Sequence, residues 1–303
     1  MLYAGVDLGG TKIACALAGP DGQLVNEQTR PTESHEGPQA VIERIARLIA
    51  ELGKPAAVGL GVPGLVDAER GVTRFLPNLP TQWRDVPVAQ ILSSKLGCPV
   101  FLLNDARMAT LGELKFGGGR GIQTMAMFTL GTGIGGGVVI DGKLRLQGGE
   151  LGHQTIIPDG PLCGCGNRGC LEALASGPAI AAEGVRLMKI GMAPKLRELI
   201  GGDVEKVTPL TMASAGDSAI DKAIARAARF VSIGVANVVT AIHPELVVIG
   251  GGVAGIGAPL FDAIRAGVRR RVRMFPADDV RIEPSALGEK AGLFGGVALA
   301  MQR

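Results

Sequence analysis

Two stretches of the chain repeat the same order of four elements. The sequences DLGGTKIACALAGPDGQL (residues 7–24) and TLGTGIGGGVVIDGKL (129–144) each read as a strand, a glycine turn carrying a threonine, a second strand and an Asp-Gly turn. They align with a two-residue gap. Chance recurrence is the alternative in a chain with 47 glycines, but the shared order of four elements favours an internal duplication. The chain is therefore expected to form two domains of like design.

The spacing of apolar residues predicts an α/β fold, because short apolar runs alternate with segments of helical period. Strands are expected over residues 2–8, 12–18, 23–30, 58–62, 99–103, 124–130, 138–140 and 245–249, with a glycine turn over 131–137. Helices are expected over 40–52, 88–96, 105–116, 217–243, 259–271 and 292–301. The glycine-rich run 116–121 marks a boundary. We expect a first domain over 1–116, a second over 117–290, and a C-terminal helix (291–303) packed back on the first domain.

Charge and composition exclude several classes of protein. The formal net charge is +3 and the basic residues are dispersed, so no nucleic-acid partner is expected. The dense run of Arg269, Arg270, Arg271 and Arg273 reads as a solvated helix face. The sequence contains no stretch of about 18 uninterrupted apolar residues, so no membrane span is expected. The N-terminus lacks a basic segment and a cleavage site, so a cytoplasmic location is expected.

Three of the five cysteines fall in one loop, residues 148–172 (GGELGHQTIIPDGPLCGCGNRGCLE). Thiolate and imidazole ligands suit tetrahedral Zn²⁺, and the expected ligands are His153, Cys163, Cys165 and Cys170. Four protein ligands close the coordination shell, so the ion would be structural. The alternatives are three free thiols, or one disulfide with a spare thiol. The spacing is not that of a zinc finger.

A second glycine pattern, Gly131-x-Gly133-x-x-Gly136, fits the dinucleotide-binding fingerprint. That fingerprint has meaning only between a strand and a helix. Here a strand and a hairpin turn follow it, so a nicotinamide cofactor is rejected. A nest of backbone amides that can hold phosphate oxygens remains.

Two further glycine turns follow apolar strands. Gly9, Gly10, Thr11 and Lys12 form one, and Gly250, Gly251 and Gly252 form the other. Any one of them could be only a turn. Three at strand ends are better explained by a nucleoside triphosphate held between two domains. Asp7 could hold Mg²⁺ through water or simply stabilise the turn.

Asn104 and Asp105 stand where a buried strand meets a helix. Taken alone, they read best as a helix N-cap. The alternative is a carboxylate kept ionised by the helix N-terminus and acting as a general base for a hydroxyl nucleophile. Asn78, Glu150, His153 and Glu172 would complete a polar pocket for a sugar. Glu150 or Glu172 alone could be a surface carboxylate.

Six motifs together resemble the ROK family (repressors and sugar kinases): DLGGTK (7–12), NDA (104–106), LGTGIGGG (130–137), GGELGH (148–153), CGCGNRGCLE (163–172) and VIGGG (248–252). The segment FLPNLPTQWRDVPV (75–88) also resembles that of bacterial ROK glucokinases. The resemblance covers the whole chain in order. It implies the actin-like (ribonuclease H-like) ATPase fold, with two duplicated α/β domains around a cleft.

The resemblance also implies a role for each matching residue. Asp105 would be the catalytic base. Contacts with sugar hydroxyls would come from Asn78, Asn104, Glu150, His153 and Glu172, with Gly64 lining the sugar site and His153 also binding zinc. Gly10, Thr11, Lys12, Thr132, Gly133, Gly251 and Gly252 would surround ATP. Family kinases are commonly homodimers or tetramers.

The implied activity is that of an ATP:hexose 6-phosphotransferase acting on glucose, with Mg·ATP as donor and a structural Zn²⁺. N-acetylglucosamine, N-acetylmannosamine and fructose kinases share nearly all these motifs, and polyphosphate is an alternative donor. Sugar-responsive repressors of the family carry an N-terminal helix-turn-helix domain, for which the turn at Gly9 leaves no room. Arg107 and Met108 follow Asp105 where the family's kinases usually have smaller residues. An inward-facing Arg107 would make Asp105 a weaker base.

Overall fold

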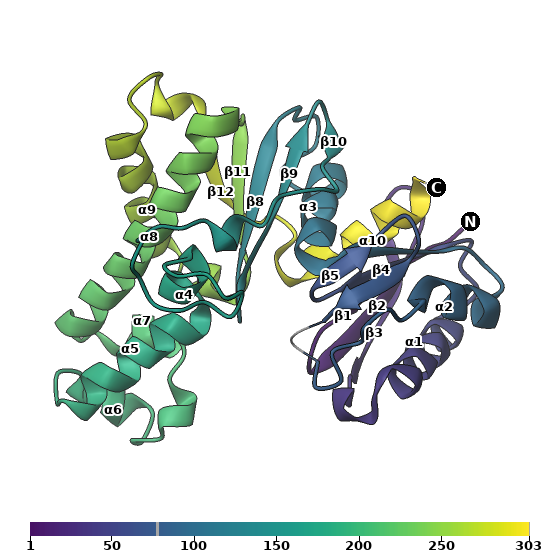
Figure 1. Cartoon of the computed structure of the whole chain (residues 1–303), viewed down its shortest axis with the longest axis horizontal. Coiled ribbons are helices and arrows are strands. Elements are labelled where there is room, and N and C mark those ends of the chain that lie inside the picture. The colour runs from purple at the N-terminus through teal and green to yellow at the C-terminus, as the bar shows by residue number, and fades with distance from the viewer. Residues whose placement is uncertain (77–78, 303) are drawn as a thin grey trace. The chain divides into compact units, whose positions relative to one another are not determined.

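The computed structural model describes residues 1–76 and 79–302, and the chain divides into two compact units (Figure 1). Unit 1 comprises Met1–Gly121 and Ser285–Arg303, and unit 2 comprises Ile122–Pro284. The last helix therefore groups with unit 1. The domain boundaries expected from the sequence, at residues 116 and 290, stay a prediction.

Unit 1 is built on a five-stranded sheet of order β3-β2-β1-β4-β7. The strands are β1 (Tyr3–Leu8), β2 (Lys12–Ala18), β3 (Leu24–Pro31), β4 (Val58–Val62) and β7 (Val100–Asn104). The first three form the antiparallel meander expected from the sequence, whereas β1, β4 and β7 run parallel. The carboxyl ends of these three strands share one edge of the sheet. A two-stranded hairpin, β5 (Leu65–Asp67) and β6 (Val72–Phe75), was not expected.

Helices cover both faces of this sheet (Figure 1). On one face, α1 (Pro38–Leu52) and α2 (Val88–Leu96) pack on alternate strand residues, including Val6 and Leu17. On the other face lie α3 (Asp105–Phe116) and α10 (Ala291–Met301). The backbone of α10 approaches so closely that a Cβ built on Gly59 would lie 2.1 Å from the carbonyl oxygen of Gly296.

Unit 2 repeats this sheet. Its order is β10-β9-β8-β11-β12, with β10 (Lys143–Leu144), β9 (Ile134–Ile140), β8 (Met125–Leu130), β11 (Leu246–Gly250) and β12 (Arg281–Pro284). The first two pairings are antiparallel and the last two are parallel, as in unit 1. The same order and directions support the internal duplication. The short strand β12 was not expected.

The glycine turn expected over residues 131–137 is too long. Strand β9 begins at Ile134, and Gly135, Gly136 and Gly137 pair with Thr129, Phe128 and Met127 of β8. At Gly136 the Leu151 side chain packs closely, since a Cβ there would lie 2.7 Å from Leu151 Cγ. The turn itself is limited to residues 131–133. The strand after the turn agrees with the rejection of a dinucleotide site.

The core of unit 2 forms around α8 (Ser218–Ile242) and α9 (Ala258–Arg271), close to their expected positions. Helix α8 has the length and apolar composition of a membrane span, but 56% of its most apolar window is buried in the fold. Four shorter helices were not expected: α4 (Leu171–Ala175), α5 (Gly177–Lys189), α6 (Pro194–Leu199) and α7 (Pro209–Ala215). The 3₁₀ turns are η1 (Ser34–Glu36), η2 (Leu151–His153), η3 (Val204–Lys206), η4 (Gly252–Ile256), η5 (Ala277–Asp279) and η6 (Gly288–Lys290).

Candidate functional site

The first glycine turn joins β1 to β2 at the carboxyl edge of the unit 1 sheet. The N–H of Gly9 donates to the carbonyl oxygen of Lys12 at 2.9 Å. Thr32 holds the turn from outside, since its hydroxyl donates to the Gly9 carbonyl at 2.7 Å and its N–H donates to the Thr11 carbonyl at 2.9 Å. Gly10 lies between these fixed points. Sequence reasoning missed Thr32, whose fully buried side chain gives no local signal.

Asp7 lies one residue from the end of β1, beside the start of α10. A Cβ on Gly292 would lie 2.8 Å from Asp7 Oδ2, so glycine is needed where the helix passes the carboxylate. Burial raises the pKa of Asp7, and the positive charge of Lys12 partly offsets that effect. A buried carboxylate beside a glycine turn fits a Mg²⁺ site, because a bound cation favours the charged form.

At the junction between β7 and α3, one of the two candidate residues caps the helix. Asn104 is the N-cap, and its Oδ1 accepts from the N–H groups of Ala106 and Arg107 at 3.1 and 3.2 Å. Its Nδ2 donates to the carbonyl of Gly64 at 3.1 Å and to Asp105 Oδ1 at 3.0 Å. Asn104 therefore ties Gly64 to Asp105 and orients the carboxylate.

Asp105 is the first residue of α3, and its Oδ1 also accepts from the Ala106 N–H at 2.8 Å. These donors and the helix N-terminus favour the carboxylate form. Arg107, the departure noted in the sequence, is buried in α3 with 8% of its surface exposed. Met108 contacts the position of Gly61, on the neighbouring strand β4. Asn78 lies outside the described residues.

The four expected metal ligands converge in unit 2, although up to 17 residues separate them in sequence. Cys163 Sγ lies 3.7 Å from His153 Nδ1, and Cys165 Sγ lies 3.7 Å from Cys170 Sγ. All four ligand atoms lie within 4.8 Å of one another. A tetrahedral zinc ion, with Zn–S bonds of about 2.3 Å, sets its sulfurs about 3.8 Å apart. The residues therefore fit Zn²⁺, and all five cysteines are free, so no disulfide competes for them.

The protein environment already distinguishes the thiols. Burial raises the pKa of Cys163 to about 12, whereas the backbone N–H of Asn167 lowers the pKa of Cys165. The Asn167 side chain donates to Cys170 Sγ at 3.5 Å and to the Thr155 hydroxyl at 3.0 Å. Such outer hydrogen bonds orient metal ligands. Asn167 was not singled out from the sequence, although it lies within the ligand motif.

The other two glycine turns lie side by side in unit 2. Residues 131–133 form a tight turn in which the Gly131 N–H donates to the Gly133 carbonyl at 2.9 Å, with Thr132 exposed between them. Gly250 pairs with Thr129 at the end of β8. Gly251 has φ of +85°, and a Cβ there would lie 2.4 Å from the Leu130 carbonyl oxygen. Gly252 then opens η4.

The remaining sugar-site candidates lie within the metal loop, residues 148–172. Glu150 precedes η2, and His153 ends it. Glu172 lies in the first turn of α4, where its Oε2 accepts from the Ile134 N–H at 2.8 Å. The structure thus brings Glu150, His153 and Glu172 into the unit that carries the metal loop and the second and third glycine turns. Asp7, Gly64, Asn104 and Asp105 gather in unit 1.

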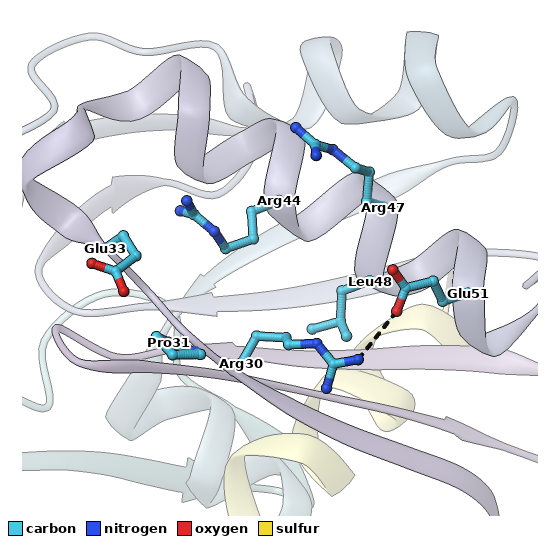
Figure 2. A pocket seen from close by; sticks show the side chains of 7 residues that line it. All are labelled: Arg30, Pro31, Glu33, Arg44, Arg47, Leu48 and Glu51. Atoms are coloured by element: carbon cyan, nitrogen blue, oxygen red, sulfur yellow. Dashed lines mark hydrogen bonds and ion pairs between the residues drawn. The ribbon is translucent and has the colours of Figure 1, made fainter.

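A pocket of about 280 Å³ lies between α1 and β3 of unit 1 (Figure 2). Its lining is Arg30, Pro31, Glu33, Arg44, Arg47, Leu48 and Glu51. Each arginine already has a carboxylate partner, as with Arg30 and Glu51 at 3.4 Å. Arg44 also donates to the Thr32 carbonyl at 2.7 Å. Arg44 therefore supports Thr32, and because each arginine of the lining is already paired, the pocket gives no reason to assign it a ligand.

Comparison with known proteins covers the whole chain. The model of the ROK family matches residues 3–303. A glucokinase of Thermotoga maritima is 39% identical over 99% of this chain and 97% of its own length. The crystal structure of a Streptomyces griseus ROK glucokinase in complex with glucose and AMPPNP superposes with a TM-score of 0.87 at 33% identity, covering all of both chains. The ROK hexokinase of Thermus thermophilus gives a TM-score of 0.83 at 37% identity, covering all of this chain and 98% of its own.

Relatives of another class are also similar. A xylose repressor of Caldicellulosiruptor bescii is 31% identical over 98% of this chain and 77% of its own length. The duplicated sheets and these structural neighbours identify the actin-like ATPase fold. The match of the family model from residue 3 to residue 303 and the identity to glucokinases along nearly the full length agree, and the chain belongs to the ROK family.

Proposed function

We propose that this protein is an ATP-dependent hexokinase that transfers the γ-phosphoryl group of ATP to the 6-hydroxyl of glucose. The observation that carries the proposal is the full-length similarity to the glucokinase crystallised with glucose and AMPPNP. The residues of unit 1 support it, because Asp105 presents a positioned carboxylate at the carboxyl ends of the parallel strands β1, β4 and β7.

Asp105 is the proposed general base. In phosphoryl transfer the protein mainly positions groups and stabilises charge, and an aspartate accepts the proton of the attacking hydroxyl. The Asn104 amide and the Ala106 N–H both bind Oδ1. They hold the carboxylate in one orientation, so the sugar hydroxyl meets a base whose position is set before substrate arrives.

Asn104 has a supporting role in this proposal. Both of its amide N–H groups have acceptors within the protein, the Gly64 carbonyl and Asp105 Oδ1. The side chain can therefore offer a sugar only its oxygen, which already accepts two backbone N–H groups. We assign Asn104 chiefly to the orientation of Asp105 and Gly64. Glu150, His153 and Glu172 are the proposed sugar contacts in unit 2.

The glycine turns are the proposed phosphate-binding elements. Backbone amides of residues 9–12, 131–133 and 250–252 would hold the triphosphate, with Asp7 as the carboxylate for Mg²⁺. When bound, Mg²⁺ neutralises charge on the phosphate oxygens. The Zn²⁺ site has four protein ligands and no open position, so its role is to hold the loop that carries His153 and Glu172.

Location and assembly complete the proposal. We place the enzyme in the cytoplasm as a homodimer or homotetramer, with no nucleic-acid or membrane partner. N-acetylglucosamine, N-acetylmannosamine and fructose are the competing sugars, because their kinases share nearly all of the motifs found here.

A coupled assay of ADP release across these hexoses tests the proposal. Glucose is expected to give the highest kcat/KM, and Asp105→Asn is expected to lower kcat by about 10²–10⁴-fold. The asparagine keeps an oxygen that can accept the Ala106 N–H, so the fold should survive. Asp203→Asn is the control, because Asp203 also accepts a backbone N–H at a helix start but is exposed. Turnover by Asp105→Asn close to that of the wild type would reject Asp105 as the base.

A further inference from the structure

The carboxylate of Glu172 connects the metal loop to the second glycine turn. Glu172 follows the metal ligand Cys170 by two residues, and its Oε1 lies 3.7 Å from Sγ of the ligand Cys163. Its Oε2 accepts the Ile134 N–H at 2.8 Å. Ile134 comes directly after the turn at residues 131–133. One side chain therefore contacts both a metal-binding residue and the backbone next to the proposed phosphate-binding turn.

The Glu172 carboxylate leaves no room for a side chain at position 133. A Cβ on Gly133 would lie 2.4 Å from Glu172 Oε2 and 3.3 Å from its Cδ. Any larger residue would push the carboxylate out of its hydrogen bond with Ile134. Gly133 does not have a positive φ, so its backbone angle does not require glycine. The requirement comes from the close approach of Glu172.

The same segment supports the turn a second time. The Ser176 N–H donates to the Glu172 carbonyl at 3.1 Å, and the next residue, Gly177, donates its N–H to the Gly131 carbonyl at 2.8 Å. Leu171 is fixed in turn by its N–H bond to the Gln154 carbonyl at 2.9 Å. Residues 170–177 thus run from a metal ligand to both ends of the glycine turn.

We infer that Glu172 is a positioning residue through which occupancy of the zinc site sets the affinity of the turn at residues 131–133 for nucleotide phosphates. This inference rests on the proposed function of that turn. With the ion bound, Cys163 and Cys170 are fixed, and the Glu172 carboxylate beside Cys163 accepts the Ile134 N–H. Without the ion, hydrogen bonds through Asn167 are what connect these two residues: the Cys163 N–H donates to the Asn167 carbonyl at 2.8 Å, and the Asn167 side chain donates to Cys170 Sγ at 3.5 Å. Glu172 is then held less firmly. Zinc then supports the nucleotide site as well as the sugar loop.

Nucleotide binding without sugar tests the coupling. Calorimetric titration with Mg·AMPPNP is run on zinc-loaded protein and on protein stripped with a zinc-selective chelator and returned to Mg²⁺. Zinc removal is expected to weaken wild-type binding by about tenfold. Glu172→Ala is expected to keep its zinc, because Glu172 is not a ligand, and to bind AMPPNP weakly in both forms. The two effects should not add.

Three variants separate coupling from general damage. Glu172→Gln keeps an oxygen that can accept the Ile134 N–H, so it should retain the zinc-dependent affinity. Glu183→Ala removes a partly buried carboxylate of α5, outside the metal loop and the turn at residues 131–133, that pairs with Arg186 and Arg226, and should bind AMPPNP as the wild type does. Gly133→Ala, whose Cβ displaces the carboxylate, should match Glu172→Ala and replaces it if that variant does not fold.

The outcomes are distinct. Wild-type affinity in Glu172→Ala, or a wild-type response of that variant to zinc, would overturn the inference. Wild-type protein that binds AMPPNP equally well with and without zinc would overturn it too, but would leave the kinase proposal intact. Zinc-loaded wild type that binds no AMPPNP would instead contradict the proposed function itself.

Discussion

Two aspartates at one edge of the unit 1 sheet differ in their surroundings. Asp105 accepts the Ala106 N–H and the Asn104 amide, which favour its charged form. Asp7 is buried beside α10, and that burial raises its pKa. The first arrangement suits a base ready to accept a proton. The second suits a carboxylate whose charge Lys12 stabilises in part and a bound cation would stabilise further.

Asp7→Asn is therefore expected to stabilise the protein in the absence of nucleotide and Mg²⁺. A carboxyl group whose pKa is raised on folding binds more protons in the native state than in the unfolded state. Stability consequently falls as the pH rises from the unfolded pKa, about 3.9, through the folded one. Asparagine removes this penalty. Its Tm should exceed that of the wild type at pH 7, and the difference should vanish below about pH 4.

The same variant should lose catalysis, since asparagine brings no charge to Mg²⁺. We expect kcat to fall by about 10²-fold or more, in the range of losses seen when one charge-stabilising group is removed. Thermal unfolding across the pH series, with the ADP-release assay beside it, measures both effects. A Tm at pH 7 equal to or below the wild-type value would contradict the argument from burial.

At the scale of elements, close packing between α10 and the unit 1 sheet depends on glycine. A Cβ on Gly5 would lie 2.0 Å from the Leu293 carbonyl oxygen, and one on Gly59 would lie 2.1 Å from that of Gly296. In each case the added Cβ would clash with a backbone atom, and backbone cannot move away by changing rotamer as a side chain can. The last helix of the chain thus packs directly against the backbones of the first and fourth strands.

Gly59→Ala should consequently destabilise unit 1 by about 2–3 kcal/mol through overpacking. Gly255→Ala in η4 is the control, because its Cβ would meet only the end of the Leu210 side chain, at 3.1 Å. That control should change the free energy of unfolding by less than about 1 kcal/mol. Urea denaturation of the two variants measures the difference. Equal free energies of unfolding for the two variants would mean that α10 can move away from position 59 with little loss of stability.

On the scale of the whole molecule, one buried carboxylate holds both segments that carry the chain between the units. Glu113 of α3 is fully buried. Its Oε2 accepts the Gly118 N–H at 2.9 Å, next to the outgoing segment. Its Oε1 accepts the Ser285 hydroxyl at 2.5 Å and the Leu287 N–H at 2.9 Å, on the returning segment 172 and 174 residues later. Glu113 therefore links the two segments of unit 1, residues 1–121 and 285–303, by hydrogen bonds to both.

Glu113→Ala leaves the Gly118 and Leu287 N–H groups without their acceptor. We expect it to lower the free energy of unfolding by about 2–4 kcal/mol, because hydrogen bonds to a charged group are the strong ones. Thr110→Val on the same helix is the matched control. Among the described residues, the hydroxyl of Thr110 bonds to the Ala106 carbonyl of its own helix and to no other group, so its loss should cost less than about 1 kcal/mol. Similar costs in urea denaturation would refute the special role of Glu113.

Local patterns in the sequence were sufficient for much of this molecule. They predicted the strands of the first meander, the long core helix over residues 217–243 and the four zinc ligands. Apolar spacing and ligand spacing act over a few residues, so they can be read without the fold. The expected glycine turn over 131–137 failed in its second half, because the pairing of residues 135–137 with β8 is a contact between strands.

By itself, the sequence determined the α/β class and the duplicated design, and it predicted the four candidate metal ligands that the fold brings together. Tertiary structure alone decided which of Asn104 and Asp105 caps α3, that Thr32 holds the first glycine turn, and that Glu172 reaches Ile134, 38 residues earlier. The reason is range. A hydrogen bond between distant segments has no local signature, because its two partners become neighbours only when the sheets and helices between them have packed.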